Sequence, residues 1–210
     1  MFKTDRLCAF SDGVVAIAIT LLVLGLEVPS VHEVPEQQLR DYLIASLHPL
    51  IGFVVSFVLI GTYWLQHYAI FHYITHVDRV LVALNGLFLL CVSFVPFPTG
   101  LQAAYRDDET AMVIYGGAQI ACSLSLLALW LYATRRHRFI DKHVSPQAIR
   151  SMTWRIALTP VISATAIATS FVSLTACRAI FLAIPVLHFS RRSTDSGWSE
   201  DNREGHDFAA

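Results

Sequence analysis

Residues 13–28 read GVVAIAITLLVLGLEV and carry no charge before Glu27. A helix needs about 20 predominantly apolar residues to cross the hydrocarbon core of a bilayer, and about 17 is the lower limit. Two acids, Asp5 and Asp12, stand where a secretory signal peptide would have a basic segment, and no small-residue cleavage motif follows the run. The stretch therefore favours a retained transmembrane helix over a cleaved leader.

Four further apolar runs follow along the chain. The last of them is too long for one membrane span and long enough for two short spans, with a turn expected at 173–176 and Arg178 near the boundary. Two spans in this run give six helices in total, whereas one kinked span would give five. The four runs are residues 43–65, 80–96, 111–133 and 156–189.

The overall composition agrees with this class of protein. Of 210 residues, 55% are hydrophobic and only 15% are charged, whereas a soluble domain has about 25% charged residues. The chain lacks the polar surface of a water-facing globule and is too apolar for intrinsic disorder. We expect an all-α integral membrane protein with one transmembrane domain over residues 1–190. A disordered cytoplasmic tail is expected over residues 191–210, which are rich in Ser, Asp, Glu, Arg and Asn.

Lysine and arginine residues predict the orientation, because they remain mostly on the cytoplasmic side of a membrane. With the N-terminus inside, twelve of them fall in inner segments, whereas only Arg40 and Arg106 fall in outer loops. This bias requires an even number of spans, since Arg191 and Arg192 have to return inside, and it therefore supports six. Both termini are expected in the cytoplasm and the chain in the plasma membrane.

The predicted outer loops are acidic. One interpretation is a solvated loop surface, and the other is a vestibule that raises the local concentration of cations, because charge of one sign in a confined mouth focuses the field. The acids concerned are Glu27, Glu33, Glu36, Asp41, Asp107, Asp108 and Glu109.

Several classes of function are disfavoured by what the sequence lacks. The Walker A, GxSxG, HExxH and GxGxxG motifs are absent, so we expect neither an enzyme nor a bound cofactor. The TVGYG potassium filter is absent too. His72 and His76 have a spacing able to bind metal, but no acidic or cysteine ligand is fixed nearby, so an interfacial belt is favoured and no metal site is expected. A net charge of −1 provides no basic field for nucleic acid.

The entry to the first helix contains Ser11 and Asp12, for which two interpretations are open. Either side chain can cap a helix N-terminus, where it satisfies free N–H groups. Alternatively, Asp12 pairs with Arg6 and fixes this helix against its neighbours, because an ionisable residue at the membrane edge needs a partner.

Further along the first helix, Ile17, Leu21, Leu24 and Val28 recur at a spacing that forms one stripe on a helix face. In a lipid-facing helix such a stripe carries no information, because every face is apolar. If several copies of the helix surround an axis, however, the stripe forms stacked apolar rings that can close a pore by dewetting.

Polar residues also interrupt the second and third runs. Trp64 and His67 lie one turn apart and can present N–H donors on one helix face, suited to a buried acceptor at the entry to the first helix. Asn85 in an apolar run predicts a hydrogen bond between helices. Pro96 and Pro98 are expected to end the third span.

Taken in order, these residues resemble the prokaryotic transmembrane protein 175 family of potassium channels. The resemblance covers about residues 5–100, and the sequence departs from the family pattern at Gln66, where many members carry a second histidine. The matching segments are Arg6-x-x-x-Phe10-Ser11-Asp12 with the apolar run after it, Tyr63-Trp64-x-x-His67, Asp78, Asn85, and Ser93-Phe-x-Pro-Phe-Pro-Thr99.

The resemblance implies a six-helix subunit that assembles as a homotetramer, with the first helix lining a central pore and no re-entrant selectivity loop. It places the narrowest hydrophobic ring at Ile17 and further rings at Leu21 and Leu24. Thr20, beside the ring, matches a position tied to ion selectivity. The family also has a hydrogen-bonded network that holds the pore helix, which here would comprise Arg6, Phe10, Ser11, Asp12, Trp64 and His67.

The resulting hypothesis is a potassium-permeable cation channel whose partners are K⁺ ions, the lipid bilayer and further copies of the chain. A narrow apolar ring favours K⁺, because less free energy is needed to strip water from K⁺ than from the smaller Na⁺. Two alternatives remain: a proton-coupled secondary transporter that uses Asp12 and His67, and a non-conducting membrane scaffold.

Overall fold

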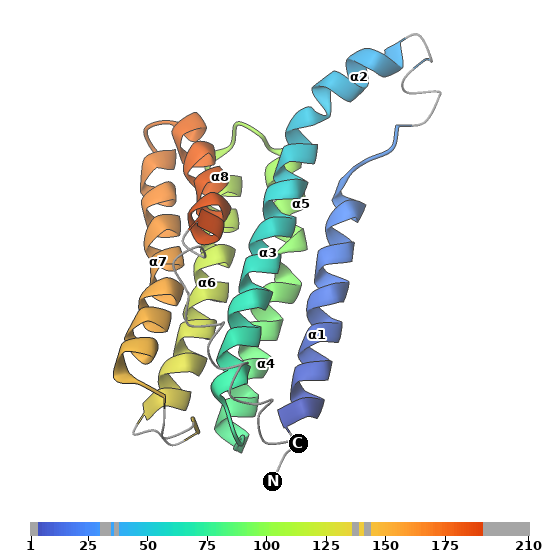
Figure 1. Cartoon of the computed structure of the whole chain (residues 1–210). Helices are drawn as coiled ribbons and strands as arrows, with labels where there is room; N and C mark the ends of the chain where they lie inside the picture. Colours follow the sequence, from blue (N-terminus) through green and yellow to red (C-terminus); the bar gives the residue numbers. More distant parts are fainter. Residues whose placement is uncertain (1–3, 30–34, 36–37, 136–138, 141–143, 191–210) are drawn as a thin grey trace, which may run out of the picture.

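The computed structural model describes residues 4–29, 35, 38–135, 139–140 and 144–190, and the regular structure of this part of the chain is helical. Helix α1 (Thr4–Leu21) continues into a 3-10 helix, η1 (Leu22–Gly25). The short helix α2 (Leu39–Ala45) leads into the long helix α3 (Leu47–Tyr73), as Figure 1 shows. The tail predicted over residues 191–210 lies outside the described residues.

The third span is built from two consecutive helices. Asp78 caps helix α4 (Arg79–Phe94), because its carboxylate accepts a hydrogen bond from the Leu81 N–H at 2.8 Å. We expected Pro96 and Pro98 to end this span, and that prediction was wrong, since both lie in the first turn of helix α5 (Pro96–Ala104). A proline at this position needs no N–H partner and has a backbone angle that suits a helix start.

The second half of the chain forms three helices. Helix α6 (Glu109–Thr134) is capped by Asp108, and helix α7 (Pro146–Ser170) is capped by Ser145. Helix α8 (Leu174–Ser190) follows after a short turn, so the last apolar run does divide into two helices. The turn comes slightly earlier than expected. Helix α7 begins well before the apolar run, because its Ser-Pro start signal lies in the polar segment that precedes this run.

Four helical segments of the described chain are long and apolar enough to cross a membrane. This makes the chain a multi-pass membrane protein. The apolar part of α8, Leu174–Ile184, is shorter. The four segments are Thr4–Gly25, Leu39–Tyr73, Arg79–Ala104 and Glu109–Thr134.

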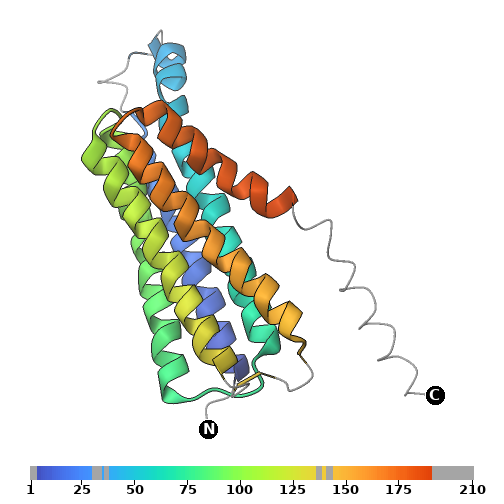
Figure 2. The same cartoon turned by 90° about the vertical axis from the view of Figure 1, so that its left-hand side faces the viewer.

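The helices pack as a bundle in which α6 is central and α1 is peripheral. In the most apolar stretch of α6, 56% of the residues are buried, whereas in that of α1 only 22% are buried. Helix α6 packs against both α4 and α7, whereas α1 lies along one edge against α3 and α4 (Figure 1). Helix α8 slants across the bundle (Figure 2). One whole side of α1 therefore has no cover from its own subunit.

Two loops meet at the end of the bundle where α1 begins. The N–H of Thr75 donates to the carbonyl of Phe139 at 2.9 Å, and Ile74 and Ile140 form an antiparallel bridge. These contacts connect the α3–α4 loop to the segment that follows α6. They hold the end of α3 in place beside the start of α1.

Candidate functional site

Helix α1 presents two different faces. Ser11, Val15, Ala18 and Leu22 recur at three- and four-residue spacing and are buried against the rest of the subunit. The residues on the other side of the helix are exposed. Because an α-helix turns by about 100° per residue, this second face points away from the bundle of its own subunit.

The exposed face carries the apolar stripe, which consists of Ile17, Leu21 and Leu24. Their side chains are 60%, 42% and 74% exposed, respectively. The 3-10 winding of η1 places Leu24 above Leu21, because residues three apart eclipse in such a helix. Val28 was expected in the stripe as well, but the helix ends at Gly25 and the following backbone is extended, so Val28 lies on no helix face.

Thr20 lies on the exposed side of α1, beside the stripe. Its hydroxyl donates to the carbonyl of Ile17 at 2.8 Å. The donor is thus occupied within the helix, and the hydroxyl oxygen keeps its lone pairs as acceptors. Such an oxygen can offer a partner to a cation that passes along this face.

A chain of hydrogen bonds ties α1 to α3 and α4 through a buried asparagine. The Asn85 amide donates from Nδ2 to Ser11 Oγ at 2.9 Å, and its Oδ1 lies 2.8 Å from His67 Nε2. Because a carbonyl oxygen only accepts, His67 carries its proton on Nε2 and donates here. The His67 ring also stacks on Phe88. Sequence reasoning predicted a partner for Asn85 but left this residue out of the site, which it in fact connects.

A second contact joins α1 to α3 at the surface of the subunit. Trp64 Nε1 donates to Asp12 Oδ1 at 2.8 Å. Both side chains are partly or largely exposed. The expected donor on α3, Trp64, is therefore present, but it donates to the exposed carboxylate of Asp12 rather than to a buried acceptor.

The structure overturns the capping interpretation of Ser11 and Asp12. Helix α1 begins at Thr4, so both residues lie inside the helix, and the Ser11 hydroxyl donates to the carbonyl of Leu7 at 2.8 Å. Arg6 and Asp12 form no ion pair with each other, since a separation of six residues places them roughly 120° apart around the axis. Arg6 lies on the exposed side of the helix.

Phe10 is 63% exposed and lies on the same side of α1 as the apolar stripe. It therefore does not act as a wedge within its own subunit. Its position, one to two turns before Ile17 on the helix face, continues the stripe toward the start of α1.

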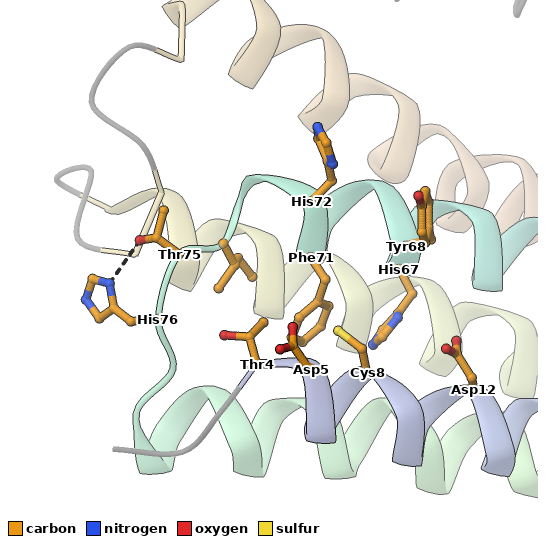
Figure 3. Close-up of a pocket in the computed structure, with 11 residues that line it drawn as sticks. Thr4, Asp5, Cys8, Asp12, His67, Tyr68, Phe71, His72, Thr75 and His76 are labelled. Carbon is orange, nitrogen blue, oxygen red and sulfur yellow. Dashed lines mark hydrogen bonds between the residues drawn. The ribbon is translucent and has the colours of Figure 1, made fainter. Parts of the chain in front are cut away.

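Side chains from the start of α1 and the end of α3 converge on a cavity of about 790 Å³ (Figure 3). No group of three or more potential metal ligands forms within the described part of the chain. The cavity brings together several titratable groups at the end of the bundle where α1 begins, namely Asp5, Cys8, Asp12, His67, His72 and His76.

At the opposite end, two of the predicted outer acids have structural partners. Asp107 lies 3.6 Å from Arg178 on α8, and the same guanidinium donates to the carbonyl of Arg106. Asp108 accepts hydrogen bonds from the N–H groups of Thr110 and Ala111. These bonds hold the pKa of the Asp108 carboxyl below its usual value. Glu33 and Glu36 lie outside the described residues, and the cation-concentrating vestibule stays a prediction.

Comparison with known proteins places this geometry in context. Residues 6–96 match the family described as "Endosomal/lysosomal potassium channel TMEM175". A relative named a potassium channel from Streptomyces collinus is 39% identical over 162 residues, which cover 75% of this chain and 78% of the relative. Another from Chamaesiphon minutus is 36% identical and covers 81% of this chain and 86% of the relative.

A solved structure also resembles this one. It is titled the crystal structure of a lysosomal potassium-selective channel TMEM175 homolog from Chamaesiphon minutus. The two agree with a TM-score of 0.79 at 33% sequence identity, and the match covers 90% of this chain and 97% of that chain. The agreement therefore extends well beyond residues 6–96.

Proposed function

The chain belongs to the TMEM175 family of potassium channels, and from this premise we propose that it conducts K⁺ through an axial pore lined by α1. The family consists of ion channels and not of enzymes. The observation that carries the proposal is the apolar stripe, three side chains in register on the one face of α1 that its own subunit leaves uncovered.

The exposed face of α1 supports assembly into a homotetramer. Arg6 and Asp12 are both exposed on a helix that crosses the membrane, and ionisable residues at this depth face a protein interior or water rather than lipid. Copies of the chain arranged around a closed axis would cover these side chains. The number four follows from the family resemblance.

Ile17 forms the narrowest ring of the proposed pore. A ring of isoleucine side chains excludes water when it is closed and makes each ion lose part of its hydration shell when it is open. Stripping costs less for K⁺ than for Na⁺, so the ring alone favours K⁺. Leu21 and Leu24 form two further rings, and Thr20 supplies an oxygen beside the first.

The hydrogen-bonded network fixes the position of the pore helix. Ser11 and Asp12 anchor one side of α1 to Asn85, His67 and Trp64 on α3 and α4. Since the same helix carries Ile17 little more than one turn further on, a rotation of α1 would move the ring. Arg6 and Phe10 are both exposed on α1, and their part in the network rests on the family resemblance.

Six spans per subunit complete the proposal, with α7 and α8 as the fifth and sixth. Both termini lie in the cytoplasm, because this arrangement keeps the basic residues inside. The channel resides in the plasma membrane, and the six-helix channel domain extends over residues 1–190.

A second candidate function is a proton-coupled secondary transporter that uses Asp12 and His67. The observation in its favour is that both residues line the inner cavity (Figure 3). His67 is buried, however, and its Nε2 is engaged by Asn85, so a proton on this atom is held by the fold rather than exchanged. This favours the channel.

Purified protein in a planar bilayer distinguishes the two functions. We expect single-channel current steps with K⁺ on both sides and smaller steps with Na⁺. Saturable flux at a fixed stoichiometry with protons, without current steps, would contradict the channel and support the transporter.

A further inference from the structure

Apart from the pore helix, a chain of hydrogen bonds runs through the interior of the subunit. Thr99 Oγ1 donates to Ser56 Oγ at 2.9 Å, and Ser56 Oγ lies 3.1 Å from Tyr115 OH. Gln119 follows Tyr115 one turn along α6. We name this set of buried side chains the polar spine, and its members are Thr99, Ser56, Tyr115, Gln119, Tyr63 and Ser123.

The polar spine reaches the middle of the bundle. Tyr63 OH donates to Gln119 Oε1 at 2.9 Å, and Ser123 Oγ donates to the carbonyl of Gln119 at 2.8 Å. Thr99 lies on α5 near the outer end, whereas Ser123 lies halfway along α6. The spine thus connects α3, α5 and α6 and extends about two turns along α6, from Tyr115 to Ser123.

Three polar side chains around the inner end of the spine lack partners within the described residues. Gln119 Nε2 and Ser163 Oγ are unpaired, and both residues are fully buried. Both amide atoms of Gln66 are unpaired as well, and this side chain is only 8% exposed. Burying a polar group without a partner is unfavourable, and lipid supplies no partner at this depth.

Two of the three unpaired groups lie at the same level on facing helices. Trp130 Nε1 donates to Thr153 Oγ1 at 2.9 Å, and a Cβ atom on Gly116 would lie 2.5 Å from Ile167 Cγ1. These two pairs define one antiparallel register between α6 and α7. In that register Ser163 faces the turn of α6 that contains Gln119.

The remaining unpaired group and a proline add to this site. Gln66 follows Tyr63 by three residues on α3, so it lies on the side of that helix from which Tyr63 reaches Gln119. Pro160 lies inside α7, one turn before Ser163, and has no N–H. The carbonyl of Ile156 therefore lacks its usual donor four residues on.

We propose that water molecules bind inside each subunit between α3, α6 and α7, at the level of Gln119 and Ser163. A buried water makes about three hydrogen bonds. The unpaired amide and hydroxyl groups offer both hydrogen-bond donors and acceptors at this level. Apolar neighbours cannot pair with these groups, whereas water can. This hydrated site is separate from the pore along α1 and is independent of whether the pore conducts.

The first test compares two buried serines of α7 by thermal unfolding of the full-length protein in nanodiscs. Ser163→Ala removes one ligand of the bound water, so we expect a Tm lower than wild type by about 2–4 °C. The control is Ser170→Ala, since the Ser170 hydroxyl donates to the Ile167 carbonyl of its own helix at 2.7 Å, and its Tm should stay near wild type. In a dry interior, Ser163→Ala would only remove an unpaired hydroxyl, so an equal or higher Tm overturns the proposal.

The second test detects the water directly by X-ray radiolytic footprinting. Hydroxyl radicals formed from bound water oxidise the side chains beside it, so we expect oxidation of Tyr63 although it is fully buried. Phe88 is equally buried but stacks on the His67 ring and is not a member of the spine, and it should stay unmodified. Tyr105 is exposed and serves as the positive control, because its oxidation shows that the radical dose is sufficient. An unmodified Tyr63 at a dose that oxidises Tyr105 overturns the proposal.

Discussion

Asn85 on α4 donates from its amide nitrogen to the hydroxyl of Ser11 on α1, over 2.9 Å. The other end of the same amide accepts from His67 on α3. One side chain thus connects three helices, and the helix that lines the proposed pore is held through it. An amide suits this role because it donates and accepts at once in a place without water.

Replacing Asn85 with leucine should therefore destabilise the subunit by about 2–3 kcal/mol, because it leaves the His67 Nε2–H group buried without a partner and removes the donor to the Ser11 hydroxyl. Thermal unfolding measures the loss. The control is Ser93→Ala on the same helix, since that hydroxyl donates to the carbonyl of Leu89 within α4. An Asn85→Leu variant as stable as this control would show that the bridge does not hold α1.

A polar side chain at Ile17 should hydrate the proposed constriction. We expect Ile17→Asn to increase the K⁺ flux into proteoliposomes at least several-fold and to weaken the preference for K⁺ over Na⁺, because a wetted ring no longer strips the ions. Ile17→Val keeps the ring apolar and should retain the preference. If Ile17→Asn leaves both flux and preference unchanged, Ile17 does not face the pore.

Asp12 should matter more for assembly than for permeation. Asp12→Ala removes the acceptor of the Trp64 N–H, so we expect fewer tetramers on native gels. Asp12→Asn retains an acceptor oxygen and should assemble better than the alanine variant. Trp64→Phe removes the donor instead and should resemble Asp12→Ala. Normal tetramers from Asp12→Ala would argue against this structural role.

Close packing between α6, α7 and α8 depends on a glycine. A Cβ atom on Gly116 would lie 2.5 Å from Ile167 Cγ1 and 3.3 Å from the Phe181 ring. Gly116→Ala should therefore destabilise the protein by about 1–3 kcal/mol. The adjacent Gly117→Ala is the matched control, because its Cβ would meet nothing within 4 Å. Equal Tm values for the two variants would contradict the packing.

Stability should decrease in acid through Asp108. Its pKa in the folded protein is below the usual value because its carboxylate accepts N–H groups at the start of α6, so its contribution is present above the unfolded pKa of about 3.9 and is lost as the pH falls through the folded pKa. Asp108→Asn caps the helix without titrating. We expect the unfolding midpoint of the wild type to fall relative to this variant as the pH decreases below about 4. A constant difference between the two would exclude this contribution.

Much of the fold could be predicted from the sequence, because membrane helices follow from local composition. The length of the apolar runs and the position of the basic residues predict where the helices lie. The spacing of Ile17, Leu21 and Leu24 predicts a common face. These properties depend on residues close together in the chain, which is why they can be derived without a structure.

Helix ends were harder to predict, because a cap competes with its neighbours. Asp12 has the chemistry of a cap, yet α1 begins at Thr4. Pro96 has the chemistry of a helix breaker, yet it starts α5 directly after α4. The same residue chemistry suits more than one position, since a proline fits the first turn of a helix as well as the end of one, so a single residue does not determine where a helix begins or ends.

The sequence by itself determined that this protein is a helical membrane protein with an apolar stripe on its first helix. Only the tertiary structure decided which face of that helix its own subunit covers, and which residue joins Ser11 to His67. It also decided that Gln119 and Ser163 lie at the same level on facing helices. These contacts join residues far apart in the chain, and they depend on the register and rotation of packed helices, which hydropathy does not encode.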